Sequence, residues 1–369
     1  YSMVILWTVG MFTFIAAYAA RQNGGDIFSA VDGFKLGGTD VPHYSNIAEN
    51  WYRNDGTDNR FMIVFFPLFP LLLKIAKSAV QSYVWSALLI NAVLAVFSGI
   101  GFYKLSGLVL KKRNVNRAVK MLYIFPAAFF FYIPMTEALF MACTVYFFLF
   151  LVKRKYLWVF VFGFLAALTR IQGILLLVPF IAEIIREFLP SEDRQEAKPG
   201  VIKILAGFGA PLGFGVYLMI NFMVYGDAFQ YMAYQREHWY QSASYFWNTV
   251  SYLQNYGAGY LQEKSYGYFL SLSLPALVTA FGSLTLLLIG AKKRLRLSLM
   301  MYAVVYFVVS YAPTWLLSGP RYMMCCFPLA MIAGTALDGH KRAERVLSVF
   351  YLAAYFLYLH MFLTRYPVY

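Results

Sequence analysis

Residues 38–70 read GTDVPHYSNIAENWYRNDGTDNRFMIVFFPLFP. They follow an apolar segment near residues 1–20 and precede a nearly unbroken series of apolar segments. Their polar side chains include Asp40, His43, Asn46, Glu49, Arg53, Asp55, Asp58 and Arg60. A membrane-bound chain retains ionisable groups mainly where they serve a function. This stretch therefore predicts a site that the remaining helices surround.

The composition places the chain in the membrane. Of its 369 residues, 61% are hydrophobic and 13% are charged, whereas soluble domains average about 25% charged residues. Apolar runs long enough to cross a bilayer recur throughout. The net charge of +14 lies in short clusters between these runs, which is typical of membrane topology. Membrane lipids are the expected partner of these clusters, and nucleic acid is not.

The expected fold class is all-α, a polytopic membrane protein with about 10–13 membrane segments. We treat residues 1–369 as one domain, with a first external loop at 21–60 and a second at 225–265. We interpret the first apolar segment as a retained helix. The predicted apolar segments are 1–20, 61–80, 84–110, 118–134, 138–152, 156–169, 171–185, 204–224, 266–291, 299–317, 322–337 and 346–363. Only an odd number of crossings fits between the first loop and the basic cluster that begins at Lys111, yet two apolar segments lie there, so we interpret one of them as re-entrant or interfacial. Segment 61–80, with Pro67 and Pro70, is the candidate.

The basic clusters predict the orientation, because Lys and Arg concentrate in cytoplasmic loops. The cytoplasmic groups are 111–117, 153–155, 186–203, 292–296 and 341–345. Five other places then share the opposite face: the loop of Asp40, Glu137, Arg170, the loop 225–265, and Arg321.

Asp40 and His43 are the first candidates for catalysis. A carboxylate at the membrane face can remove a proton from a hydroxyl group, and His43 lies three residues on, within reach of the same side of a helical turn. Alternatively, Asp40 caps a helix that begins near Val41, and His43 is an interfacial residue. No third ligand has a spacing typical of a metal site, so a divalent metal is not indicated.

Glu137, Arg170 and Arg321 interrupt apolar surroundings. Glu137 is a candidate for orienting the catalytic groups, or else a device that caps a helix. Arginine offers a planar fork of donors suited to phosphate, and Tyr322 directly follows Arg321. The alternative for both arginines is snorkelling or pairing with an acid. His238 and Trp239 lie in the aromatic second loop, which can stack on a sugar ring or belong to an interfacial aromatic belt.

Several stretches together resemble the PIG-V-type mannosyltransferases, a family of the GT-C superfamily. They are Asp40-x-x-His43, Ile47-Ala48-Glu49, Phe65-Phe66-Pro67-Leu68-x-Pro70, Thr136-Glu137-Ala138-Leu139-Phe140, Thr169-Arg170-x-x-Gly173, Pro320-Arg321-Tyr322 and Phe327-Pro328-Leu329. Each motif alone is weak, but the ordered set is fairly specific and spans most of the chain.

The resemblance implies an enzyme that transfers a sugar, with inversion, from a polyprenyl-phosphate carrier to a glycan, lipid or protein acceptor outside the cytoplasm. Asp40 would be the base, with His43 and Glu137 orienting it. Arg321, Arg170 and Tyr322 would hold the donor phosphate. Glu49, His238 and Trp239 would contact the substrates.

The length and the lack of glycosylation sequons favour a prokaryotic plasma membrane over the endoplasmic reticulum. Two rival interpretations are a transporter or flippase of a lipid-linked or anionic solute, which would use the same arginines without chemistry, and a non-catalytic membrane scaffold. A transporter is expected to carry its polar groups at mid-membrane in broken helices, whereas these groups gather at one face.

Overall fold

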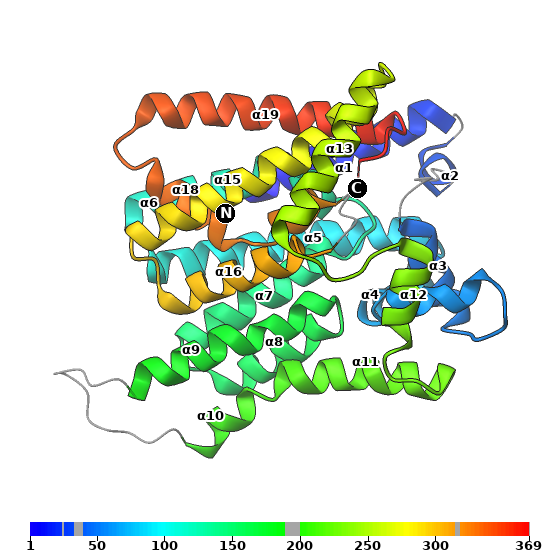
Figure 1. Ribbon diagram of the computed structural model, residues 1–369, viewed down its shortest axis with the longest axis horizontal. Coiled ribbons are helices and arrows are strands. Elements are labelled where there is room, and N and C mark those ends of the chain that lie inside the picture. Colours follow the sequence, from blue (N-terminus) through cyan, green and yellow to red (C-terminus); the bar gives the residue numbers. More distant parts are fainter. Residues whose placement is uncertain (24–25, 33–39, 189–199, 314–317, 369) are drawn as a thin grey trace.

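The computed structural model describes residues 1–23, 26–32, 40–188, 200–313 and 318–368. Within these ranges the secondary structure is helical, apart from one isolated bridge between Ala243 and Pro313. Most helices run roughly alongside one another (Figure 1). The predicted all-α class is confirmed.

The elements follow one another along the chain. They are α1 Ser2–Asn23, α2 Ile27–Asp32, α3 Val41–Asn50, η1 Asp58–Val64, α4 Leu68–Val80, α5 Tyr83–Val109, α6 Lys112–Tyr123, η2 Ala128–Phe131, α7 Glu137–Val152, α8 Tyr156–Ala167, η3 Ile171–Leu176, α9 Leu177–Phe188, α10 Val201–Ala206, α11 Gly209–Tyr225, α12 Gln230–Trp239, α13 Phe246–Gln262, α14 Tyr266–Tyr268, η4 Phe269–Ser273, α15 Leu274–Lys292, α16 Leu297–Ser310, α17 Gly319–Met324, α18 Pro328–Ala336 and α19 Lys341–Leu363.

Four stretches of the described chain are long and apolar enough to cross a membrane as helices: Ser2–Gln22, Tyr83–Val109, Tyr266–Lys292 and Lys341–Leu363. Two further pairs, η1 with α4 and α11 with α12, pass the same test but are bent by 109° and 77°. The bend before α4 agrees with the interpretation of segment 61–80 as a re-entrant or interfacial element. Helices α7, α8 and α16 are shorter and apolar.

Several segments predicted as single spans are interrupted: 204–224 is divided between α10 and α11, and two others break near prolines. Within 118–134, α6 ends at Tyr123 and the chain continues irregularly past Pro126. Within 322–337, α17 ends at Met324 and α18 restarts at Pro328. Proline has no N–H for a helical hydrogen bond and clashes with the preceding turn, so neither helix continues through it.

Helix α7 occupies the centre of the fold, packed against α5 and α8 (Figure 1). Its residues are buried on every side from Glu137 to Leu149. The helix is apolar on all sides, so every face can pack against neighbouring helices. Its first residue, Glu137, is consequently an acid inside a packed core.

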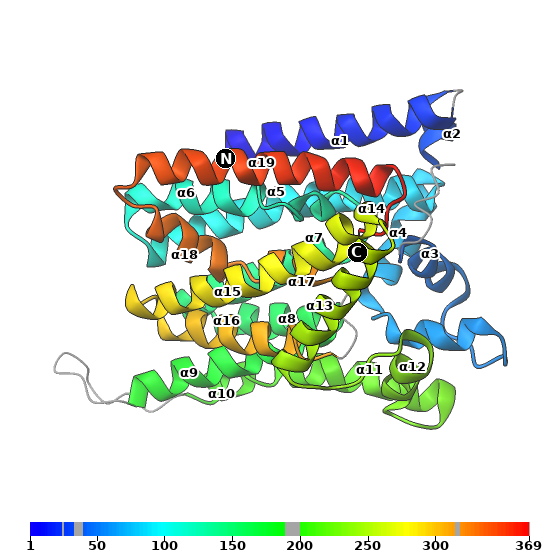
Figure 2. The same ribbon diagram turned by 45° about the horizontal axis from the view of Figure 1, so that its top comes forward.

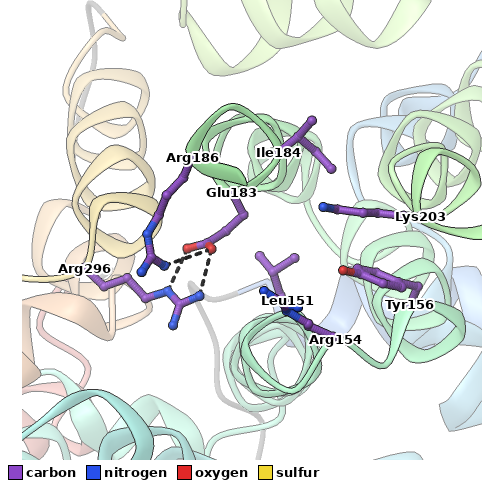
Figure 3. Close-up of a pocket in the computed structure, with 8 residues that line it drawn as sticks. All are labelled: Leu151, Arg154, Tyr156, Glu183, Ile184, Arg186, Lys203 and Arg296. Carbon is purple, nitrogen blue, oxygen red and sulfur yellow. Dashed lines mark hydrogen bonds and ion pairs between the residues drawn. The ribbon is translucent and has the colours of Figure 1, made fainter. Parts of the chain in front are cut away.

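Basic clusters lie at the other end of the fold. Arg154 follows the C-terminus of α7, and with Arg186, Lys203 and Arg296 it lines a cavity around Glu183 (Figure 3). Residues 137 and 151 are 14 positions apart on α7, or about 21 Å along the helix axis. The cavity is therefore remote from Glu137. Figure 2 shows the same separation, with α9 and α10 at one end and α3 and α12 at the other.

Candidate active site

Glu137 is held in place by an irregular, buried segment at residues 124–136. Asn91, a buried residue of α5, donates its amide to the carbonyl oxygens of Ile133 and Met135, the latter at 2.9 Å. The carboxylate lies in the first turn of α7, where the helix dipole favours negative charge. Thr136 makes no capping hydrogen bond with its side chain. Glu137 thus projects its charge away from its own helix end and toward other elements.

Two arginines meet Glu137 inside the core. Arg170 Nη1 donates to Glu137 Oε1 at 2.6 Å. Arg321 Nε lies 2.9 Å from the same oxygen, although its N–H is not aligned as a hydrogen bond. Glu137 Oε2 is buried and accepts no hydrogen bond from the described residues. Arg170 and Arg321 therefore both pair with an acid, which was one of the predicted alternatives. Neither side chain extends to the surface, as a snorkelling arginine would.

Asp40 completes the cluster. Arg321 Nη2 donates to Asp40 Oδ2 at 2.7 Å. The residue occupies the N-cap position of α3, yet its side chain makes no capping hydrogen bond there. The capping interpretation of Asp40 is therefore wrong in this structure, because the guanidinium of Arg321 offers the carboxylate a charged donor in place of backbone N–H groups.

The four side chains carry two negative and two positive formal charges. Their exposed fractions are 0% for Glu137, 9% for Arg170, 8% for Arg321 and 26% for Asp40. Buried charges are costly unless each has a partner, and this chain of contacts supplies one to each. Asp40 forms the accessible side of the cluster, so a ligand that enters meets Asp40 before the buried arginines.

The backbone near Arg170 is fixed by close packing. Gly173 sits against the backbone of Ala166, where a side chain would collide. The amide of Leu68 donates to the carbonyl of Leu168 at 3.1 Å and ties the start of α4 to this turn. The ring of Tyr322 lies 5.1 Å from the guanidinium carbon of Arg170, a cation–π contact. Tyr322 thus contacts the predicted phosphate-binding arginines directly.

His43 and the second loop meet beside Asp40. The His43 ring stacks on Phe65 at 5.0 Å, and Phe65 contacts Trp239 at 5.8 Å. The ring of His238 stacks on Phe61 at 4.3 Å. Burial lowers the pKa of His43 below its ordinary value, Asp40 opposes that shift, and His238 adds to it. His43, Phe61 and Phe65 therefore form one aromatic wall with His238 and Trp239 next to the carboxylate.

Glu49 is exposed on α3 and makes no ion pair with the described residues. Its predicted contact with substrate stays a prediction. Asn91 and Phe61 were not among the residues predicted for the site, and Phe65 was quoted in a motif without an assigned role. Asn91 carried a signal, because a lone amide in an apolar helix needs internal partners. Phe61 carried none, since aromatic residues make up 20% of the chain.

No group of three or more His, Cys, Asp or Glu side chains is placed to hold a metal ion in the described part of the chain. The charges that Asp40 and Glu137 carry are instead neutralised by guanidinium groups. Within this cluster, arginine is the cation available to an anionic ligand.

No family model and no curated protein sequence matches the chain. One solved structure that does match is that of ArnT from Cupriavidus metallidurans bound to undecaprenyl phosphate. The TM-score is 0.55 at 15% sequence identity, covering 89% of this chain and 60% of that one. The chain thus spans about 60% of the length of ArnT. This level of identity shows a shared fold alone, so the chain has the all-helical, polytopic membrane fold of that structure.

Proposed function

We propose that the protein is a membrane glycosyltransferase that moves a sugar from a polyprenyl-phosphate carrier to an acceptor hydroxyl. The observation that carries the proposal is the Asp40–Arg321–Glu137–Arg170 cluster at one end of a fold shared with a protein solved with undecaprenyl phosphate. Such a cluster combines a carboxylate base with two cations that suit a phosphate. The apolar carrier would lie between helices while its phosphate reaches the arginines.

The reaction follows from these groups. Asp40 takes the proton from the acceptor hydroxyl as its oxygen attacks the anomeric carbon of the sugar. The bond from that carbon to the phosphate oxygen breaks, and polyprenyl phosphate leaves with one additional negative charge. Arg321 and Arg170 stabilise that charge where it develops. Direct displacement in one step inverts the configuration at the anomeric carbon.

The remaining groups have supporting roles in this proposal. Glu137 orients both arginines, because it contacts each of them in the core. His43 lies beside Asp40 and is neutral near pH 7, since its pKa is lowered. Trp239 and His238 line the wall where the sugar would lie, and Glu49 would contact the acceptor. An aromatic ring next to a carboxylate is suited to the apolar face of a sugar.

The identities of the sugar, the membrane and the acceptor are proposed from the sequence. Mannose is proposed as the sugar because the ordered motifs resemble PIG-V-type mannosyltransferases. A prokaryotic plasma membrane, with the site facing away from the cytoplasm, is proposed from chain length and from the distribution of basic residues. The acceptor would be a glycan, a lipid or a protein.

The test uses the purified protein in lipid nanodiscs. Polyprenyl-phosphate mannose is added with candidate acceptors, and a matched set of other polyprenyl-phosphate sugars serves as the comparison. Mass spectrometry should detect an acceptor heavier by one sugar, with polyprenyl phosphate released in equal amount. Asp40→Asn should reduce the rate by about a hundredfold to ten-thousandfold, the usual loss when a positioned base is removed.

A second assay, in proteoliposomes, addresses the transporter alternative. The 109° and 77° bends at η1–α4 and α11–α12 are the feature of this chain that resembles a transporter with broken helices. Movement of an intact lipid-linked sugar across proteoliposomes, without cleavage of the sugar–phosphate bond, would favour transport over transfer. Turnover by Asp40→Asn within a few-fold of wild type would remove Asp40 from the mechanism.

A further inference from the structure

In this structure the arginines that would hold a donor phosphate are already bound to carboxylates. Arg170 is paired with Glu137, and Arg321 lies between Glu137 and Asp40. The formal charges of these four groups sum to zero. An incoming phosphate therefore meets no spare positive charge in the cluster, and it gains a full partner only if a carboxylate gives up its place.

Glu137 is not the carboxylate that yields. Its side chain is fully buried at the start of the central helix α7 and contacts both arginines. Withdrawing it would leave Arg170 buried without a counter-charge and Arg321 with Asp40 as its carboxylate partner, which is strongly unfavourable. The segment that carries it is also anchored by Asn91. Glu137 is a fixed part of the site.

Asp40 has the properties of the group that moves. It precedes the ten-residue helix α3 in the first loop, is partly exposed and contacts a single arginine. Arg321 Nη1 has the thioether sulfur of Met135, at 3.7 Å, as its hydrogen-bond partner, and a thioether is a weak acceptor. The outer edge formed by Nη1 and Nη2 suits two phosphate oxygens, and Asp40 occupies its Nη2 end.

We propose that Asp40 and the donor phosphate compete for Arg321, so that binding of the donor releases the catalytic base. This inference rests on the proposed function. Before the donor binds, Asp40 Oδ2 accepts from Arg321 and is not available to an acceptor hydroxyl. Once phosphate holds the guanidinium, the carboxylate is free to turn toward the acceptor. Asp40 then becomes available to the acceptor hydroxyl only after the donor has bound.

The proposal makes an unusual prediction for Asp40→Asn. Removing a catalytic carboxylate ordinarily leaves the affinity for the leaving group unchanged, but here it removes a competitor. With full-length protein in nanodiscs and undecaprenyl phosphate as the probe, the dissociation constant should fall about tenfold, equivalent to about 1.4 kcal/mol at 25 °C. The matched control is Asp58→Asn, an exposed carboxylate of the same loop, for which the dissociation constant should not change. An unchanged or weaker affinity in Asp40→Asn overturns the proposal.

Repeating the Asp40→Asn comparison in the Arg321→Gln variant distinguishes competition for Arg321 from simple charge repulsion between Asp40 and the phosphate. In Arg321→Gln the shared guanidinium is absent, so Asp40→Asn should no longer improve binding of undecaprenyl phosphate. If the improvement persists there, Asp40 acts on the phosphate through space and the competition is refuted. Each variant is first compared with wild type for its unfolding temperature and monodispersity, and the affinity comparison uses variants that match it. Arg321→Gln with Asp40→Asn removes one charge of each sign, which preserves the neutral balance of the cluster.

The result is distinguishable from the outcome of the transfer assay. If wild type transfers sugar but Asp40→Asn binds the probe no better, only the competition fails. If no donor and acceptor pair reacts, yet Asp40→Asn binds undecaprenyl phosphate more tightly through Arg321, the competition stands and glycosyl transfer is the part to abandon.

Discussion

The burial of Glu137 leads to the sharpest prediction on stability. Glu137→Gln keeps the shape of the side chain but removes a charge that faces Arg170 at 2.6 Å and Arg321 at 2.9 Å. All three side chains are at least nine-tenths buried. Breaking a buried ion pair by removing one partner typically costs about 3–5 kcal/mol, because the remaining charge stays uncompensated. We expect a loss of about this size in the free energy of unfolding.

A control with the same chemistry lies at the other end of the fold. Glu344 also contacts two cations, Arg117 at 2.8 Å and Lys120 at 2.5 Å. These side chains are 20–31% exposed, so water screens the ions and can replace the lost partner. Glu344→Gln should therefore cost about 0–1 kcal/mol. The two substitutions differ mainly in burial.

The assay is reversible unfolding in a bilayer or mixed micelle, with the free energy of unfolding measured for each variant. A double-mutant cycle adds Arg170→Gln and the pair Glu137→Gln/Arg170→Gln. Contacting charges are expected to couple by about 0.5–3 kcal/mol, so the double variant should lose less than the sum of the single ones. Equal losses for Glu137→Gln and Glu344→Gln, or a Glu137→Gln loss below about 1 kcal/mol, would refute the reasoning from burial.

Three further outcomes are expected. Arg321→Lys should weaken binding of the lipid-linked donor about tenfold to hundredfold, because Lys keeps the positive charge but lacks the planar fork of donors that arginine offers a phosphate. An unchanged dissociation constant would show that Arg321 does not bind the phosphate. The free energy of unfolding should decrease as pH falls through 6.5, the ordinary pKa of histidine, because the lowered pKa of His43 makes the unfolded chain take up the proton more readily than the folded one. His43→Gln should flatten that pH dependence, and an unaltered profile would assign it to other groups. Single cysteines at Gly56 and Ser244 should both react with an impermeant thiol reagent in intact cells, since both loops are predicted to share the non-cytoplasmic face and the native cysteines are buried; labelling of one alone would contradict the shared face.

Sequence reasoning reached the class of the protein because composition and charge act over the whole chain. A chain that is 61% hydrophobic and 13% charged cannot hide its apolar surface from water, whatever its detailed contacts. The interruptions at Pro126 and Pro328 show where such reasoning fell short. Both segments were apolar enough to be predicted as single spans, and local backbone chemistry divided them.

The candidate site was only partly accessible from sequence. The distribution of Lys and Arg grouped Asp40, Glu137, Arg170 and Arg321 at one face, because charge placement relative to the bilayer needs no knowledge of packing. The local sequence left a choice for Asp40 between a helix cap and a catalytic base, since an acid directly before a helix is compatible with either role.

Tertiary structure excluded the helix cap and paired the carboxylate with Arg321. Arg321 is 281 residues away from Asp40 along the chain, yet it binds the carboxylate at 2.7 Å. Arg170 and Glu137, 33 residues apart, meet in a core that admits almost no water. A buried charge is tolerated only with a partner, and which partner it finds depends on how distant helices pack. The sequence by itself determined that this is a membrane protein and which ionisable groups it contains. Only the tertiary structure determined which of these groups pair and neutralise each other's charge.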